Sequence, residues 1–262
     1  MKPGIYHDIS GDDYHSRAGY SASFFKQCFK ENLAKAKFNR IELTADTEEI
    51  GHGVHADVLE PDKELLVRGP DRRGTNDWKA AKEDAEWNGK ILVKGQVYDQ
   101  IKQMSASLKH HPRCGEILAW DDKVCEASIW HELDGLLVKI RPDLFSAKRR
   151  AIADVKTCQS SDPYEFQKTS WQLGYPIQAA FYVKIANEFG IPIDDFYFLT
   201  VEKKFPYLAH CHKLSRAALN YGLDVVDRML PLIKEAHESD TWLTGWPDET
   251  ELDLPSWVQE SA

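Results

Sequence analysis

Apolar positions in the first 115 residues recur every three or four residues, which is helical spacing. This pattern predicts four helices, at residues 21–36, 47–59, 76–88 and 95–110. Ser21 or Ser23 would cap the first helix, and Pro61 and Pro112 would end the second and the fourth. We therefore expect a mainly helical N-terminal part over residues 1–115.

After residue 115 the pattern changes to short apolar or alternating runs, which are typical of strands. Strands are predicted at residues 124–131, 136–141, 151–156 and 194–203, with ELDG as a hairpin turn between the first two. Helices are predicted at residues 163–171, 172–189 and 214–238. The last helix would pack through Leu214, Ala218, Tyr221, Val225 and Leu232.

This order of elements favours an α/β fold of the mixed α+β kind, in which helices flank a mixed central sheet. With 262 residues, 42% of them hydrophobic, the chain can bury one large core, so we expect residues 1–262 to form a single domain. Residues 116–240 would hold the core of this domain, and residues 241–262 would form a tail. The tail, which contains Trp242, Trp246 and Trp257, would lie over the core or dock a partner subunit.

The composition limits which cellular compartment, cofactors and binding partners we expect for this protein. No apolar run approaches the roughly 18 residues of a membrane span, and the first ten residues lack a signal core, so we expect a cytoplasmic protein. Five cysteines without a C-x-x-C pair argue against an iron–sulfur cluster and predict reduced thiols. The net charge of −9 is not typical of nucleic-acid binders, although a basic groove on an acidic body can hold a phosphate backbone.

Two aspartates and a lysine stand out at the edges of a predicted buried strand. Asp154 and Lys156 are two residues apart and share a face of that strand, while Val155 turns into the core. Pairing of residues 136–141 with this strand would bring Asp143 beside Asp154. Two adjacent carboxylates repel each other unless a cation lies between them, and oxygen ligands suit magnesium or manganese. The alternative is a surface ion pair on an edge strand, with Asp143 merely ending its neighbour.

The spacing of these residues resembles a known catalytic core. Pro142 and Asp143, followed by Asp154, Val155 and Lys156, resemble the PD-(D/E)XK nuclease motif. Further blocks, in the same order along the chain, resemble the nuclease domain of exonuclease VIII, the RecE family of prophages. These blocks are GIYHDIS with DYH at 4–15, GHGVHADVLEP at 51–61, RRGTN at 72–76, EASIW at 126–130 and YPIQAAFY at 175–182.

The resemblance implies a restriction-endonuclease-like core and a metal site. His55, Asp143, Asp154 and the carbonyl of Val155 would bind Mg²⁺, with Mn²⁺ as a substitute, and Lys156 would position the attacking water. A lone helical histidine is more often structural, but the motif favours His55 as a ligand. His52, three residues earlier, departs from the family pattern and leaves open which imidazole binds the metal.

Three more residues are placed near the metal by the resemblance. Gln178 and Tyr182 are four apart and share a helix face, where they would touch the metal-bound water or the DNA backbone. Otherwise Tyr182 packs in the core and Gln178 faces solvent. Glu126 matches a family acid, and it could hydrogen-bond a ligand, bind a second metal or be a strand-edge charge; the first is preferred.

Two basic clusters are candidates for contacts to DNA phosphates. Arg72 and Arg73 lie in a polar loop and belong to a family block. Lys148, Arg149 and Arg150 are supported only by their closeness to Asp154 in the sequence, and the alternative is that they form a solvated turn.

The resemblance implies an exodeoxyribonuclease that digests one strand of linear duplex DNA from 5′ to 3′. The remaining 3′ overhang would serve a RecT-like single-strand annealing protein, and the enzyme would form a tetrameric ring. The alternatives are a structure-specific endonuclease on the same core and an inactive scaffold that binds DNA ends. The chain would be a compact form of such an enzyme or a fragment of a longer one.

Overall fold

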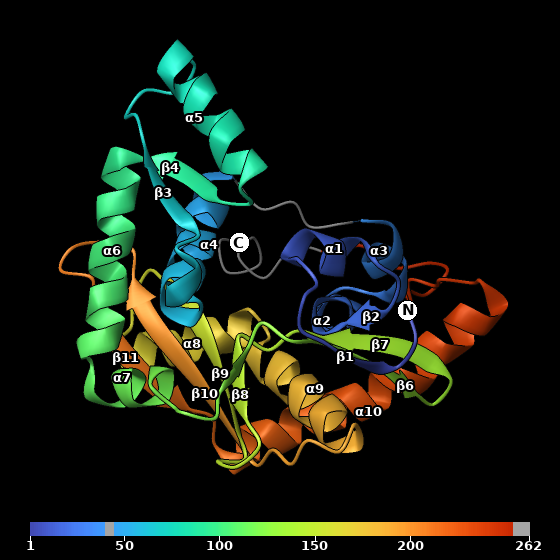
Figure 1. The fold of residues 1–262 in the computed structure, drawn as a ribbon. Helices are drawn as coiled ribbons and strands as arrows, with labels where there is room; N and C mark the ends of the chain where they lie inside the picture. Colours follow the sequence, from blue (N-terminus) through green and yellow to red (C-terminus); the bar gives the residue numbers. More distant parts are fainter. Residues whose placement is uncertain (40–44, 254–262) are drawn as a thin grey trace, which may run out of the picture.

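The fold of the computed structural model, which describes residues 1–39 and 45–253, combines three sheets with helices around them (Figure 1). The helices and sheets interleave along the chain, as the predicted mixed fold class requires. The mixed α/β fold class is confirmed, and the strands divide between a five-stranded, a four-stranded and a two-stranded sheet.

The five-stranded sheet is mixed and carries the central strand of the molecule. Its strands, in spatial order, are β11 (Ala209–Lys213), β10 (Asp195–Glu202), β9 (Ala151–Cys158), β8 (Leu144–Ser146) and β5 (Val124–Cys125). β9 and β10 run parallel along the whole of β9, whereas β8 pairs antiparallel with Ala151–Ala153 only. From Asp154 onward, β9 therefore has no strand partner on the β8 side among the described residues.

The four-stranded sheet is built around the predicted hairpin. Its order is β1 (Gly4–Tyr6), β6 (Ser128–Leu133), β7 (Leu136–Ile140) and β2 (Tyr20–Ser21). The expected strand at 124–131 is broken at Glu126, whose φ of 53° lets the chain leave β5 in one sheet and begin β6 in the other. The expected pairing of residues 136–141 with 151–156 is also wrong, because β7 lies in this second sheet and β8 pairs with β9 instead.

Alternating side chains of β9 face two different hydrophobic clusters. Ala151, Ala153 and Val155 pack with α4 (Ala45–Leu59), α6 (Gly95–His110) and α7 (Pro112–Leu118). α7 was not expected, because Pro112 begins it rather than only ending α6; proline is well tolerated in the first turn of a helix.

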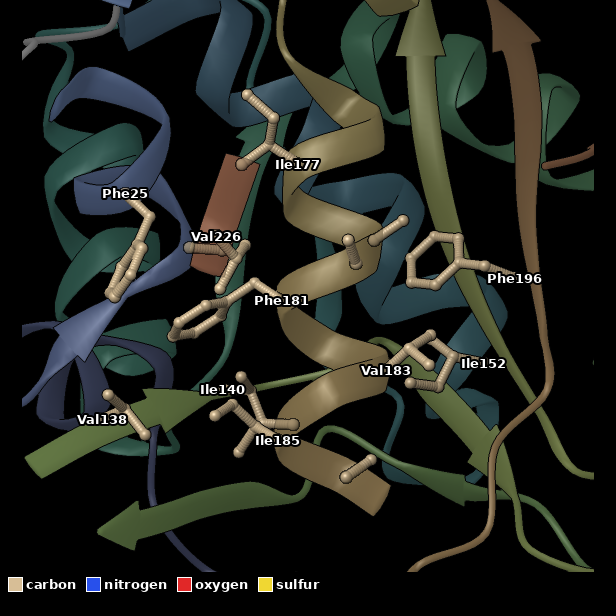
Figure 2. Packing of buried hydrophobic residues seen from close by; sticks show 14 of the residues in the cluster. Phe25, Val138, Ile140, Ile152, Ile177, Phe181, Val183, Ile185, Phe196 and Val226 are labelled. Atoms are coloured by element: carbon tan, nitrogen blue, oxygen red, sulfur yellow. The ribbon is translucent and has the colours of Figure 1, made fainter. Parts of the chain in front are cut away.

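The other face of the sheet is covered by α9 (Tyr175–Glu188), which α8 (Pro163–Gln172) precedes. Figure 2 shows Val183 of α9 beside Ile152 and Phe196, while Phe181 points the other way, toward Phe25 and Val226. The rings of Phe25 and Phe181 are 4.7 Å apart. α9 thus joins the sheet to α2 (Ala22–Lys30) and α10 (Arg216–Ser239) in one core.

The last helix packs through a different face from the one predicted. Its buried residues are Leu219, Gly222, Val225, Val226, Met229, Leu230, Ile233 and Ala236. Tyr221 and Leu232 are exposed, so only Val225 of the predicted buried set is correct among the helical positions. Gly222 sets this face, because a Cβ there would lie 2.2 Å from the Pro176 carbonyl oxygen of α9.

The N-terminal part contains short elements that hydrophobic periodicity did not predict. The expected helix at 21–36 is two helices, α2 and α3 (Leu33–Phe38), because the Asn32 side chain caps a new start at the Lys35 amide. α1 (Gly11–Ser16) precedes them, and a 3₁₀ helix (Pro61–Lys63) follows α4. β3 (Leu66–Gly69), β4 (Ile91–Lys94) and α5 (Asn76–Trp87) form an arm that projects from the body (Figure 1).

The described part of the tail packs on the body through one tryptophan. Trp242 is 8% exposed and contacts the rings of Tyr20 and Phe24, whereas Trp246 is 66% exposed. Trp257 lies outside the described residues. The five cysteines are not paired in disulfides. None of the described helices combines the length and the apolar character that crossing a membrane would require.

Candidate active site

The centre of the site is the second half of β9. Asp154 and Lys156 point toward α9, and Val155 faces the opposite core cluster, as the strand alternation predicts. Asp154 is only 2% exposed; Lys156 Nζ lies 2.5 Å from its Oδ2 atom, and Gln178 Nε2 donates to its Oδ1 atom at 3.2 Å. The edge-strand alternative is therefore wrong, because Asp154 is buried and β9 is the middle strand of its sheet.

Asp143 reaches β9 from the point where the chain crosses between the two sheets. It lies after β7 and immediately before β8, and its Oδ2 atom accepts a hydrogen bond from the Val155 N–H at 2.6 Å. This bond satisfies a backbone donor that β8 leaves unpaired. The two aspartates are thus brought together by β8 and β9, and not by β7 as the sequence suggested.

His55 extends from α4 to the same edge of β9. Its Nε2–H donates to the Val155 carbonyl oxygen at 2.8 Å, and its Nδ1 atom lies 3.5 Å from Asp143 Oδ2. His52, one turn earlier, is exposed. The structure therefore brings His55, and not His52, to the two acids.

Glu126 lies at the other crossing between the sheets, not on a hairpin strand as expected. Its backbone N–H donates to the Asp143 carbonyl oxygen at 3.0 Å, which holds the two crossings side by side. Its carboxylate accepts from Arg141 Nε at 2.7 Å. One ligand atom from each of His55, Glu126 and Asp143 lies within 4.8 Å of the others. This proximity favours Glu126 as a direct metal ligand. The sequence, in contrast, favours a role in which Glu126 hydrogen-bonds a ligand.

Burial and mutual repulsion dominate the electrostatics of the cluster. Desolvation, followed by the charge of Asp154, raises the pKa of Asp143 to about 8. Desolvation and then Asp143 raise the pKa of Glu126, and desolvation lowers that of His55. Burial opposes the charge on Lys156, but the carboxylates of Asp154 and Asp143 overcome it and raise the pKa of this lysine. The acids therefore crowd more negative charge together than one lysine relieves.

The family of this protein follows from comparison with known sequences. Residues 21–249 match the model of DUF3799, described as a PDDEXK-like domain of unknown function. The chain belongs to this PDDEXK-like family. The match includes every residue of the cluster just described, and the family's PDDEXK-like character supports a nuclease.

Solved structures agree with this fold. A candidate exonuclease from Eubacterium rectale superposes with a TM-score of 0.62 at 14% identity, over 97% of this chain and 98% of that chain. At this identity the likeness shows the fold alone. The structure of SSO0001 is less similar, with a TM-score of 0.30 at 13% identity over 70% of this chain and 86% of that chain. No curated protein matches the chain.

The donor set of this PDDEXK-like site suits a divalent cation. PDDEXK nucleases generally depend on such an ion, and the cluster offers one imidazole nitrogen and carboxylate oxygens from Glu126 and Asp143. A cation among them would offset the repulsion that raises the pKa of Asp143. Asp154 and the Val155 carbonyl adjoin this set, but Lys156 and Gln178 contact the former and His55 the latter.

Tyr182 combines packing in the core with a polar contact close to the candidate site. It packs against the main hydrophobic cluster, and its hydroxyl donates to the Arg141 carbonyl oxygen at 3.3 Å. Gln178, one turn earlier on α9, is half-buried and contacts Asp154. The pair thus contacts both the aspartate on β9 and the crossing that carries Asp143.

The two basic clusters lie in different surroundings. Arg72 is exposed in the loop before α5, and Arg73 pairs with Glu49 at 2.8 Å. The turn holding Lys148, Arg149 and Arg150 lies at the end of the β8–β9 hairpin away from Asp143. Arg149 pairs with Asp121 and Asp122, and Arg150 pairs with Asp194. For this second cluster the geometry favours the structural alternative, and its DNA contact stays a prediction.

Arg141 was not predicted as a site residue, although it lies next to both segments in which the chain passes between the two sheets. Its guanidinium donates to Glu126, to the Ser128 hydroxyl at 2.7 Å and to the Ile9 carbonyl at 2.8 Å. Its place directly before the Pro-Asp motif was a usable signal, because an arginine beside a predicted acid cluster is a natural counter-charge.

Proposed function

We propose that this protein is a metal-dependent deoxyribonuclease that hydrolyses phosphodiester bonds in double-stranded DNA. The observation that carries the proposal is the convergence of His55, Glu126, Asp143, Asp154 and Lys156 at the unpaired edge of a central strand. Buried like charges are costly unless a cation and an anionic substrate offset them. A purely structural role would not require such an arrangement.

Each residue has a distinct task in this proposal. His55, Glu126 and Asp143 would hold Mg²⁺ or Mn²⁺, with Asp154 and the Val155 carbonyl completing the site. The bound ion would supply Lewis-acid polarisation of the scissile phosphate and an acidified water. Gln178 fixes the orientation of the Asp154 carboxylate, and Arg141 fixes that of Glu126.

Lys156 would stabilise the charge that develops on the phosphate and orient the attacking water. The neighbouring carboxylates raise its pKa, so the ammonium stays protonated at neutral pH. A fixed positive charge in a buried site is worth more to a charged transition state than the same charge in water.

We further propose an exonuclease of the exonuclease VIII (RecE) type. The sequence blocks quoted above support this, and so does the likeness in fold to a protein described as a candidate exonuclease. The enzyme would act in the cytoplasm on linear duplex ends, digest one strand 5′ to 3′ and leave a 3′ overhang for an annealing protein. A tetrameric ring would keep the enzyme on its substrate.

The decisive experiment uses linear duplex DNA labelled at the 5′ or the 3′ end, with magnesium or with a chelator. Closed circular duplex is digested in parallel, and Asp154→Asn is compared with Asp134→Asn, a matched change at the exposed hairpin turn. Magnesium-dependent release of 5′ label from linear DNA, lost in Asp154→Asn only, is expected. Cleavage of the circle would instead indicate an endonuclease, and binding without cleavage would indicate an inactive end-binding scaffold.

The proposed assembly has its own measurement. Light scattering after size exclusion should give the mass of a tetramer, and the mass of a monomer would contradict the ring. Deletion of residues 250–262 tests whether the tail docks a neighbouring subunit, because a docking tail is needed for assembly and a passive one is not.

A further inference from the structure

Lys26 of α2 lies beside the candidate site, although neither the motif nor the predicted basic clusters include it. Its Nζ atom is 5.7 Å from the centre of the Tyr175 ring, and Lys156 Nζ is 5.1 Å from the same centre. Tyr175 is the first residue of α9. Two ammonium groups from distant parts of the sequence therefore share one aromatic ring.

The position of Lys26 is fixed by its neighbours. The stem of Lys26 runs along the α8–α9 turn, where a Cβ on Gly174 would lie 3.2 Å from Lys26 Cδ. The preceding residue, Phe25, is fully buried and packs on Phe181 of α9. The helix is thus anchored to the core, and its lysine is held toward Tyr175.

Lys26 has no anionic partner in the described part of the chain. No hydrogen-bond acceptor or ion-pair partner contacts its ammonium there, whereas Lys30, one turn later, donates to the Gln172 carbonyl. The nearby Asp154 carboxylate is engaged by Lys156 and Gln178. Burial and the charge of Lys156 lower the pKa of Lys26 to about 8.

A half-buried ammonium next to a second ammonium lowers stability unless an anion binds to it. The cation–π contact with Tyr175 offsets part of this cost without using any of the three N–H donors of Lys26. Those donors therefore remain available for a ligand with several acceptor oxygens. A DNA phosphate has this chemistry, and the proposed reaction places DNA at Lys156.

We propose that Lys26 binds a backbone phosphate of the DNA strand next to the scissile one, and so aligns that strand with Lys156. The inference rests on the proposed nuclease function and extends it to a residue outside the motif. Lys26 makes this contact in the bound substrate and in the transition state alike. Its loss therefore raises KM and leaves kcat largely unchanged.

The test compares Lys26→Gln with Lys26→Arg and with a matched control, Lys35→Gln. Lys35 pairs with Glu31 at 3.1 Å on the surface of the same N-terminal part, so its removal changes the net charge equally. Binding of end-labelled linear duplex is measured in chelator over a range of salt concentrations. Lys26→Gln should bind about tenfold more weakly and should lose about one unit of the slope of log K against log salt.

The control Lys35→Gln should match the wild type, and Lys26→Arg should keep most of the affinity and the slope. In magnesium, Lys26→Gln should show a KM raised about tenfold with kcat within about twofold. An unchanged slope of log K against log salt would overturn the inference, even if the affinity fell. A merely structural change can weaken binding, but it leaves the number of counterions released on binding the same.

Failure of the inference and failure of the proposed function give different results. A wild type that cleaves DNA while Lys26→Gln keeps its slope and KM overturns the role of Lys26 only. A wild type that binds DNA without cleaving it overturns the nuclease, and the salt slope still decides Lys26. A wild type that neither binds nor cleaves DNA overturns both.

Discussion

Asp143 Oδ2 accepts a hydrogen bond from the Val155 N–H at 2.6 Å. A side chain from the segment between β7 and β8 thus pairs with a backbone donor of β9 that has no partner in β8. The carbonyl of the same Val155 accepts from His55. One backbone residue therefore fixes both an acid and an imidazole of the candidate metal site.

Metal binding should depend on Glu126 as strongly as on His55. At a Mg²⁺ or Mn²⁺ concentration about a hundred times Kd, binding should stabilise the wild type by about 2.7 kcal/mol and raise Tm by about 5 °C. Glu126→Gln and His55→Gln should lose most of this rise, which differential scanning fluorimetry measures. The exposed His52→Gln is the matched control, and a loss of the rise in His52→Gln with retention in His55→Gln would reverse the assignment.

The ion pair of Asp154 and Lys156 should show strong thermodynamic coupling. Lys156→Met leaves Asp154 buried without its cation, so the free energy of unfolding in chelator should fall by about 3 kcal/mol. The double variant Asp154→Asn with Lys156→Met should be more stable than the sum of the single effects predicts, by about 1 kcal/mol or more. Urea unfolding measures all three variants, and additive effects would show that the pair is not coupled.

Stability without metal should fall as the pH rises toward 8. The folded protein keeps a proton on Asp143, whose pKa is raised to about 8, while the unfolded chain releases it near pH 4. Because the folded state binds more protons between these values, the free energy of unfolding decreases with rising pH across this window. Asp143→Asn removes this contribution, so urea unfolding in chelator at pH 5 and pH 8 should show a smaller decrease than in the wild type.

Magnesium provides the internal control for that pH dependence. A bound cation favours the ionised carboxylate, so the wild-type decrease between pH 5 and pH 8 should flatten when the metal is added. A decrease that persists unchanged with metal, or that is equally steep in Asp143→Asn, would mean that other groups cause it.

The tail should contribute to stability through Trp242 and not through Trp246. Trp242 is buried against Tyr20 and Phe24, with Lys37 Nζ 4.6 Å from its ring centre, so Trp242→Ala should cost about 3 kcal/mol. Trp246 is exposed, and Trp246→Ala should change the free energy of unfolding by less than about 0.5 kcal/mol. Circular dichroism during urea unfolding separates the two; equal effects would contradict the packing.

The sequence predicted most elements whose pattern is local. β9, β10, α5, α6 and α9 lie within a few residues of their expected positions, because alternation and helical periodicity are set by each segment's own side chains. The shared face of Asp154 and Lys156 followed for the same reason. The proximity of Gln178 to this face required the family resemblance, since helical spacing alone does not say what a helix packs against.

The sequence did not show how the strands divide between sheets. Residues 124–131 read as one apolar strand, and only the positive φ at Glu126 separates β5 from β6. Whether β7 or β8 pairs with β9 depends on contacts far apart in the chain, which periodicity does not encode. Periodicity also did not show which face of α10 is buried, because that face depends on the close approach of Gly222 to Pro176 of α9.

By itself, the sequence determined the chemical types at the site. Two aspartates and a lysine stand at the spacing of a PD-(D/E)XK motif, and the family resemblance added a histidine and a glutamate. Only the tertiary structure decided their geometry. It placed Asp143 and Glu126 at adjacent crossings, separated His55 from His52 and brought Lys26 to Tyr175. The physical reason is that side-chain type and local periodicity are properties of short segments, whereas burial, charge pairing and desolvation arise from packing between distant ones.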